Sequence, residues 1–169
     1  TTVTAVAFNA SDDASLGNYG VSKVLKVSDE SLAMFNAKAY ADTLAQAAKA
    51  EGAKVIILSS SADTKFLAPI LTAKLTAGYV PNVVEAPEST SPFVVKRTAF
   101  SNKGFAFTEI SSEIKIIGVS NNAFGVMENN VSASVEDFNP SLNDNVFSVK
   151  SAEVDRVTGK VTIADADIV

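Results

Sequence analysis

Small hydroxyl side chains and one carboxylate follow the most apolar stretch of the sequence. Val55–Leu58 is that stretch, and Ser60, Ser61, Asp63 and Thr64 come directly after it, ahead of a helical pattern. In open α/β sheets ligands bind beyond the carboxyl ends of strands, where the amides and dipole of a helix N-terminus can receive an anion. These four residues are therefore a candidate anion site. The interpretation we favour is structural: Asp63 or Thr64 simply caps the helix.

The composition excludes several kinds of catalysis. The 169 residues include neither Cys nor His, so the chain has no disulfide, thiol nucleophile, imidazole base or Cys/His zinc site. The segment Ser59 to Thr64 contains no glycine and lacks the Gly-x-x-x-x-Gly-Lys-Ser/Thr spacing of a phosphate-binding loop. We predict no catalytic residue, no metal site and no enzymatic activity for this chain.

Paired charges and exposed aromatics are the remaining candidates. Neighbouring strand residues point to opposite faces, so acidic neighbours do not converge on a metal, and we predict solvated surface charge for three pairs: Asp12 with Asp13, Glu136 with Asp137, and Asp165 with Asp167. Lys96-Arg97 could contact an acidic partner or phosphate, although strand alternation leaves one of the two in water. Three aromatic residues are predicted to be core or interface residues rather than a stacking platform: Phe100, Phe105 and Phe107.

Charge and hydropathy restrict the partners. The chain carries 14 basic and 19 acidic residues, a formal net charge of −5, so a basic face able to hold a phosphate backbone is not expected. No apolar run approaches the roughly 18 residues that a membrane-spanning helix needs. We predict one globular domain with no nucleic-acid partner and no membrane insertion.

The first third of the sequence alternates short apolar runs with helical periodicity, which is typical of βα units and a mainly parallel sheet. Strands are predicted at Val3–Phe8 and Val24–Val27. A helix is predicted at Asn36–Glu51, with Gly52 at the position that follows a helix C-terminus. Lys54–Ser59 is apolar on both faces, and we predict a central parallel strand covered by helices.

A second helix is predicted after Thr64, with Gly78 as its stop. Because proline is tolerated in the first turn and is costly further in, Pro69 predicts that this helix starts near Ala68 or bends there.

After Pro81 the pattern changes, and period-2 patterns follow a loop bracketed by Pro87 and Pro92. They predict antiparallel strands at Phe93–Phe100, Gly104–Ile110 and Ile114–Val119, with a turn at Ser101–Gly104 between the first two. Later strands are predicted at Val146–Val149 and Val154–Ile163. The predicted fold class is α/β, a Rossmann-like, mainly parallel sheet with flanking helices followed by antiparallel strands.

Six stretches of the sequence have the order and spacing of motifs from one known protein family. They are Gly20–Val24, Ser59–Leu75, Ala77–Pro81, Lys96–Thr108, Thr158–Val161 and Ala164–Val169. The first is similar to a Gly-Val-Asp-Lys-Val strand entry, and the second to a strand, small-residue loop and Leu-Ala-Pro helix. The last two are similar to a junction between domains. In this order the motifs resemble the N-terminal domain of the alpha subunit of electron transfer flavoprotein.

The resemblance implies a domain organisation. An α/β domain of the adenine nucleotide alpha hydrolase-like type would span residues 1–163, and residues 164–169 would be a stub of the C-terminal FAD-binding domain. The family domain opens with a strand and helix before the strand matched by Thr2–Phe8, so this chain looks like a fragment without them. It also departs from the family at Ile70, where an Arg is usual, and at Ile117–Val119, where Thr-Val-Arg is usual. No ion pairing is carried over to those positions.

The resemblance also implies a function. In the family the alpha subunit pairs with a beta subunit of similar fold. The heterodimer carries electrons from flavin dehydrogenases, such as acyl-CoA dehydrogenases, to a quinone oxidoreductase or another acceptor. FAD lies in the full-length alpha subunit and AMP in the beta subunit, so this chain is expected to be a scaffold and subunit-interface domain without its own cofactor. The implied location is the bacterial cytoplasm or the mitochondrial matrix. The alternative is a stand-alone adenine-nucleotide-binding domain that uses the segment Ser59 to Thr64.

Overall fold

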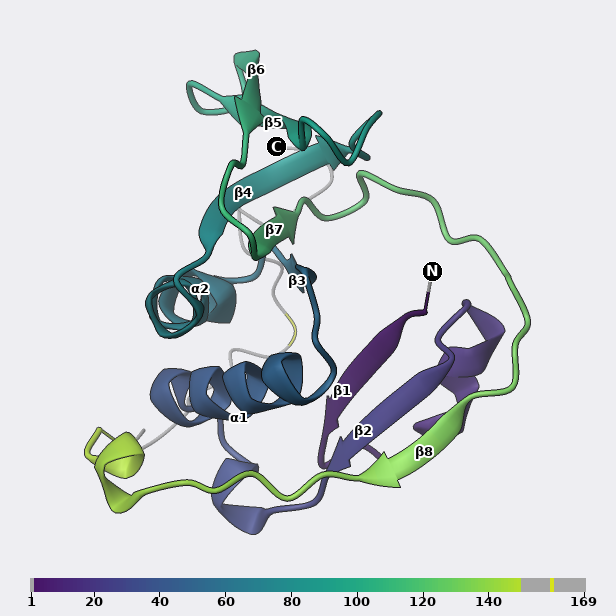
Figure 1. Cartoon of the computed structure of the whole chain (residues 1–169), viewed down its shortest axis with the longest axis vertical. Helices are drawn as coiled ribbons and strands as arrows, with labels where there is room; N and C mark the ends of the chain where they lie inside the picture. Colours follow the sequence, from purple (N-terminus) through teal and green to yellow (C-terminus); the bar gives the residue numbers. More distant parts are fainter. Residues whose placement is uncertain (1, 150–158, 160–169) are drawn as a thin grey trace.

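The described residues form two β-sheets and two main helices (Figure 1). The structure is a computed structural model, and it describes residues 2–149 and 159. In chain order the elements are β1 (Thr4–Phe8), η1 (Ala14–Asn18), β2 (Lys23–Val27), η2 (Glu30–Leu32), α1 (Ala37–Ala50), β3 (Val55–Ser59), α2 (Ala62–Leu75), β4 (Gly78–Glu85), β5 (Val94–Ala99), β6 (Gly104–Glu109), β7 (Lys115–Val119), β8 (Ser134–Asp137) and η3 (Asp144–Phe147).

The two sheets differ in strand direction. The first has the order β1-β2-β8, and all its strands are parallel. The second has the order β3-β7-β4-β5-β6, in which β3, β7 and β4 are parallel while β5 and β6 continue as an antiparallel hairpin. The α/β class, with a mainly parallel arrangement followed by antiparallel strands, is therefore confirmed.

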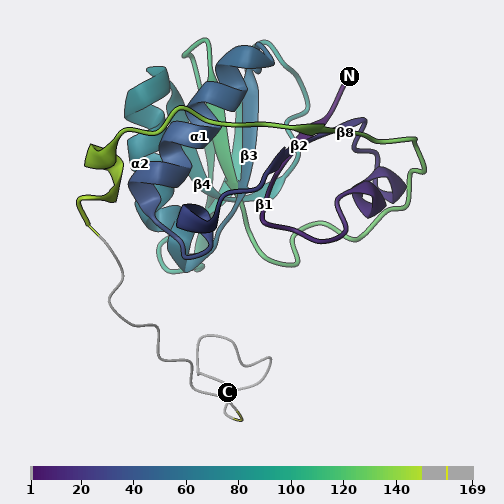
Figure 2. The ribbon, with the colours of Figure 1, turned by 90° about the horizontal axis from the view of Figure 1, so that it is seen from below.

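Helix α1 packs against both sheets. Its alanines Ala41 and Ala45 are buried with α2 and with Ile116 of the second sheet, and its Ala39 is buried with Val27 of the first. Short side chains let the helix approach its neighbours closely. The side chain of Asn36 accepts hydrogen bonds from two amides of the first turn, and the predicted helix is confirmed. Figure 2 shows α1 and α2 on the same side of β3 and β4.

The prediction that Lys54–Ser59 is a central strand is wrong. Strand β3 pairs with β7 on one side and is an edge strand of the described sheet, with Ile57 66% exposed. Alternate residues Ile56 and Leu58 pack toward the helices, as expected from the pattern. Apolar residues on both faces report what lies above and below a strand, and they carry no information about its lateral neighbours.

Helix α2 begins at Ala62, so Pro69 lies in the middle of the helix and a start near Ala68 is wrong. The alternative, a bend near Ala68, stays a prediction. The helix ends at Leu75, and the C-cap residue is Thr76, with a left-handed φ of 50°, rather than Gly78. Gly78 instead opens β4, where a Cβ atom would lie 2.5 Å from the Ile110 side chain. The glycine is therefore needed for close packing and does not cap the helix.

Strand β4 was not predicted, because Pro81 interrupts its pattern. The pairing of β4 with β7 shifts register between Val80 and Val83, and Asn82 inside this irregularity has a φ of 56°. A bulge accommodates a residue that lacks the N–H needed by the ladder. Strand β7 runs parallel to both β3 and β4, so its antiparallel prediction is wrong, since period-2 alternation does not encode strand direction.

The last described segment also differs from its prediction. The predicted strand Val146–Val149 is wrong: residues 144–147 form the 3-10 helix η3, whose Val146 is buried in the core beside α1. Strand β8, which was not predicted, pairs in parallel with β2. The predicted strand Val154–Ile163, Asp165 and Asp167, and the proposed domain stub 164–169 lie outside the described residues.

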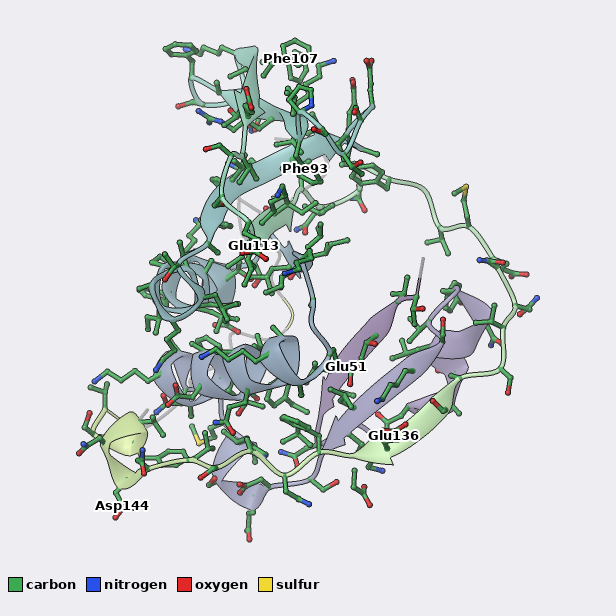
Figure 3. The ribbon with its side chains drawn as sticks, in the orientation of Figure 1. Glu51, Phe93, Phe107, Glu113, Glu136 and Asp144 are labelled. Carbon is green, nitrogen blue, oxygen red and sulfur yellow. The ribbon has the colours of Figure 1, made fainter. Side chains whose placement is uncertain are left out.

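A charged cluster ties the first sheet to the end of α1. Lys23 of β2 donates to Glu51 at 2.9 Å and pairs with Glu136 of β8 at 2.9 Å, and the Thr4 hydroxyl also donates to Glu51. The two carboxylates are labelled in Figure 3. The hydrogen bonds to Glu136 and Glu51 raise the pKa of Lys23, and the bond from Lys23 lowers the pKa of Glu51.

Candidate functional site at the carboxyl ends of the strands

A hollow of about 560 Å³ lies where the carboxyl ends of β3, β7 and β4 meet. Ile57 and Ile117 line it, whereas their neighbours Ile56 and Ile116 pack toward the helices, so the hollow is on the face away from α1 and α2. Most of the lining is apolar, and Phe124 from the following loop completes one wall. The strands of an open sheet commonly place a binding site at this end.

Four polar groups border the hollow: Ser59, Glu85, Ser120 and Asn121. None of the lining side chains described by the structure is cationic. The pyrophosphate of FAD needs cations, or amides presented by a glycine-rich turn, and Glu85 would repel it. The hollow therefore does not fit FAD. The sequence pattern missed it because Asn121 and Phe124 follow a strand whose direction was predicted wrongly.

The residues predicted to bind an anion lie in and just after the neighbouring loop, where most of them already form hydrogen bonds within the protein or are buried. The Ser61 hydroxyl accepts from the Thr64 amide at 3.2 Å, and Thr64 is buried. Ser60 accepts from the Asn82 amide at 3.4 Å, and its own amide donates to the Val119 carbonyl oxygen. Asp63 is exposed in the first turn of α2. The helix is therefore capped by Ser61, and the prediction that Asp63 or Thr64 caps it is wrong.

The same geometry makes an anion site at this loop unfavourable. The Asp63 carboxylate sits where an anion would approach the helix N-terminus, and the Ser61 hydroxyl is already used as a cap. Binding of an anion by Ser60, Ser61, Asp63 and Thr64 stays a prediction.

Ser61→Ala is expected to lower the free energy of unfolding by about 1 kcal/mol, because it removes the cap of α2. Ser61→Asp keeps an acceptor oxygen and is the matched control, expected to unfold close to the unchanged chain. Urea unfolding followed by far-ultraviolet circular dichroism measures both. Equal losses in the two variants would contradict a capping role.

The acidic pairs separate into one buried and several exposed carboxylates. Asp13 is 6% exposed and forms an ion pair with Lys26 at 3.2 Å, so its predicted place in solvent is wrong. Asp12, Glu136 and Asp137 are exposed. Within residues 2–149 and 159, no group of three His, Cys, Asp or Glu side chains could hold a metal ion.

Both basic residues of β5 have partners within the second sheet. Lys96 pairs with Glu85 of β4, and its Nζ lies 4.6 Å from the centre of the Phe105 ring. The Nε of Arg97 donates to the Thr108 hydroxyl at 3.3 Å. The two side chains thus stabilise the hairpin, and neither is held in a pocket that would receive a phosphate.

The aromatic residues of the hairpin are not core. Phe100, Phe105 and Phe107 are 85%, 62% and 74% exposed. Figure 3 shows Phe107 at the outer end of the hairpin, while Phe93 lies back beside the rest of the second sheet. These residues were predicted to be core or interface residues. Their exposure rules out the core, so a role at an interface stays a prediction.

Comparison with known proteins gives two findings. The family model of the electron transfer flavoprotein domain matches residues 1–143 of the sequence. The chain is similar to electron transfer flavoprotein subunit alpha of Bacillus subtilis (strain 168), with 25% identity over 150 residues that cover 89% of this chain and 44% of the relative. The chain thus spans less than half the length of that relative. Across the part that the structure describes, every helix is too short or too polar to cross a membrane.

Proposed function

The chain belongs to the electron transfer flavoprotein domain family, and from this membership we propose that it is the scaffold and subunit-interface part of a flavoprotein that carries electrons. The observation that carries the proposal is the family match over residues 1–143. The absence of His and Cys from the sequence supports it, since a scaffold needs no imidazole or thiol chemistry. The chain is accordingly proposed to have no catalytic activity of its own.

The finer features of this proposal concern the partners. A beta subunit is the proposed partner, flavin dehydrogenases such as acyl-CoA dehydrogenases are the proposed donors, and a quinone oxidoreductase or another carrier is the proposed acceptor. FAD, when bound, supplies the electron-accepting ring, and we assign it to portions of the full subunit beyond these residues. The apolar hollow without cationic lining supports this division of labour, because nothing there offsets the charge of a pyrophosphate.

A mixing experiment tests the proposal. The 169-residue chain and an electron transfer flavoprotein beta subunit from the same organism are purified separately, combined, and separated by size exclusion. We expect a complex with the beta subunit, and no flavin absorbance retained by the chain alone after incubation with FAD and dialysis. The matched control is an unrelated α/β protein of similar size and charge in place of the chain.

Two results would overturn the proposal. The first is flavin retained by the isolated chain at one equivalent. The second is calorimetric binding of AMP or ATP that disappears in Asp63→Ala and Ser61→Ala, which would favour a stand-alone adenine-nucleotide-binding domain.

A further inference from the structure

The floor of the hollow at the carboxyl ends of the strands is a flat apolar part of the second sheet. Ile57 of β3 is the register partner of Ile117 of β7, and Val119 of β7 is the register partner of Val83 of β4. All of them line the hollow, on the sheet face away from α1 and α2. Because these branched side chains stand beside each other on neighbouring strands, the floor suits a flat ring better than a long flexible chain.

An aromatic wall stands beside this floor because of a turn that follows β7. The Ala123 amide donates to the Ser120 carbonyl oxygen at 3.3 Å, and Asn122 has a left-handed φ of 57° at the third position of the turn. The Ser120 amide donates to the Val83 carbonyl oxygen at 2.9 Å, so the turn is fixed to β4. The turn therefore holds Phe124, which is 44% exposed, at the side of the hollow.

The polar groups at the rim disfavour a negatively charged ligand. Glu85 is the one charged side chain among the described lining residues, and its carboxylate pairs with Lys96 of β5. Two hydroxyls and one amide complete the rim, and they come from Ser59, Ser120 and Asn121. These groups both donate and accept hydrogen bonds. An anionic ligand would meet a carboxylate and no described cation, whereas an uncharged amide would find hydrogen-bond partners.

We propose that the hollow binds a small, uncharged heteroaromatic molecule that carries an amide or a similar pair of hydrogen-bond donor and acceptor. The ring lies on the apolar floor beside Phe124, and the donor and acceptor reach Asn121 at the rim. The volume of about 560 Å³ is typical of small-molecule sites, which combine an apolar lining with a few polar groups. The proposal goes beyond the proposed electron-carrier function and does not depend on it.

A pair of indole probes tests both the place and the charge of the ligand. Indole-3-propionamide is flat and uncharged, and two-dimensional NMR of the isotope-labelled chain locates where it binds. We expect the backbone amide signals of Ile57, Glu85 and Phe124 to shift together, with a dissociation constant on the order of 1 mM for a ligand of this size. Indole-3-propionate has the same ring and length but is anionic, and it should bind about fivefold more weakly.

Substitutions separate the role of the aromatic wall from that of the carboxylate. Phe124→Ala should weaken binding of the uncharged probe about tenfold. Phe107→Ala is the matched control, because Phe107 is 74% exposed on β6, away from the hollow, and its removal should leave binding unchanged. Glu85→Gln keeps the size of the side chain and removes its charge, so the anionic probe should then bind nearly as tightly as the uncharged one.

Each outcome of these titrations decides for or against the proposal. Signal shifts that gather at the hollow, a preference for the uncharged probe and weaker binding in Phe124→Ala support it. It is wrong if the uncharged probe shifts no signal of the hollow, or if the unchanged chain binds the anionic probe equally tightly. Equal weakening by Phe124→Ala and Phe107→Ala also contradicts it, because binding would then depend on exposed aromatic rings in general.

Discussion

Leu71→Ala is expected to lower the free energy of unfolding by about 3 kcal/mol, because it removes buried apolar groups and leaves a cavity behind. Leu71 lies on α2, is fully buried, and belongs to the core between the two helices and the second sheet. Its neighbours across the helix interface include Ala41 and Ala45 of α1, whose methyl groups are too short to fill the space. The expected loss therefore lies within the range of about 2–5 kcal/mol that is typical of buried leucines.

Phe66→Ala is the matched control for this variant. Phe66 is on the same helix and is larger than leucine, but it is 67% exposed, so its removal should change the unfolding free energy by less than about 0.5 kcal/mol. Urea unfolding followed by circular dichroism at 222 nm is suitable, since the chain has no tryptophan for fluorescence. A loss in Phe66→Ala as large as in Leu71→Ala would show that the helix packs differently.

Local signals of the sequence predicted most elements correctly and failed on their arrangement. Helix α1 was predicted correctly because its signals are local in sequence: the alanine periodicity runs along the helix, Asn36 precedes its first turn and Gly52 follows its last turn. The edge position of β3 and the direction of β7 depend on which strands pair, and pairing is set by contacts distant in sequence. The alternation of apolar residues indicates which face of the sheet each side chain occupies, and it does not indicate which strands lie next to each other.

Backbone exceptions account for other failures. Thr76 ends α2 in a left-handed conformation that a β-branched residue rarely adopts, and Gly78 was therefore the more natural prediction. Pro81 concealed β4 because the irregularity that accommodates it is formed by pairing with β7. At Pro81, pairing with a neighbouring strand overrides the local preference.

The candidate site was predicted in part. The loop after β3 does lie at the carboxyl ends of parallel strands, as the pattern of Ser59 to Thr64 indicated. The apolar hollow beside it needs Asn121 and Phe124, which are far away in the sequence and carry no motif. Burial of Asp13 could not be predicted either, since its cation comes from a strand 13 positions later.

Lys26→Met is expected to lower the free energy of unfolding by about 3 kcal/mol, because it leaves a buried carboxylate without its cation. Asp13 precedes η1, Lys26 is on β2, and their charged atoms are 3.2 Å apart. The Oδ1 atom of Asp13 has no hydrogen-bond partner among the described residues, so Lys26 is the one group that compensates the burial of this carboxylate there. The change keeps the length and apolar stem of the side chain, so the loss reports charge rather than packing.

The two partners should respond unequally to substitution. Asp13→Asn leaves behind a lysine that is about one-third exposed and can turn to water, so this variant should lose only about 1 kcal/mol. The double variant Asp13→Asn/Lys26→Met contains no unpaired charge and should recover at least about half of the loss in Lys26→Met. Urea unfolding of all four proteins closes the thermodynamic cycle. Equal losses in the two single variants, or additive losses in the double variant, would mean that Asp13 is solvated and that the pair does not anchor η1 to β2.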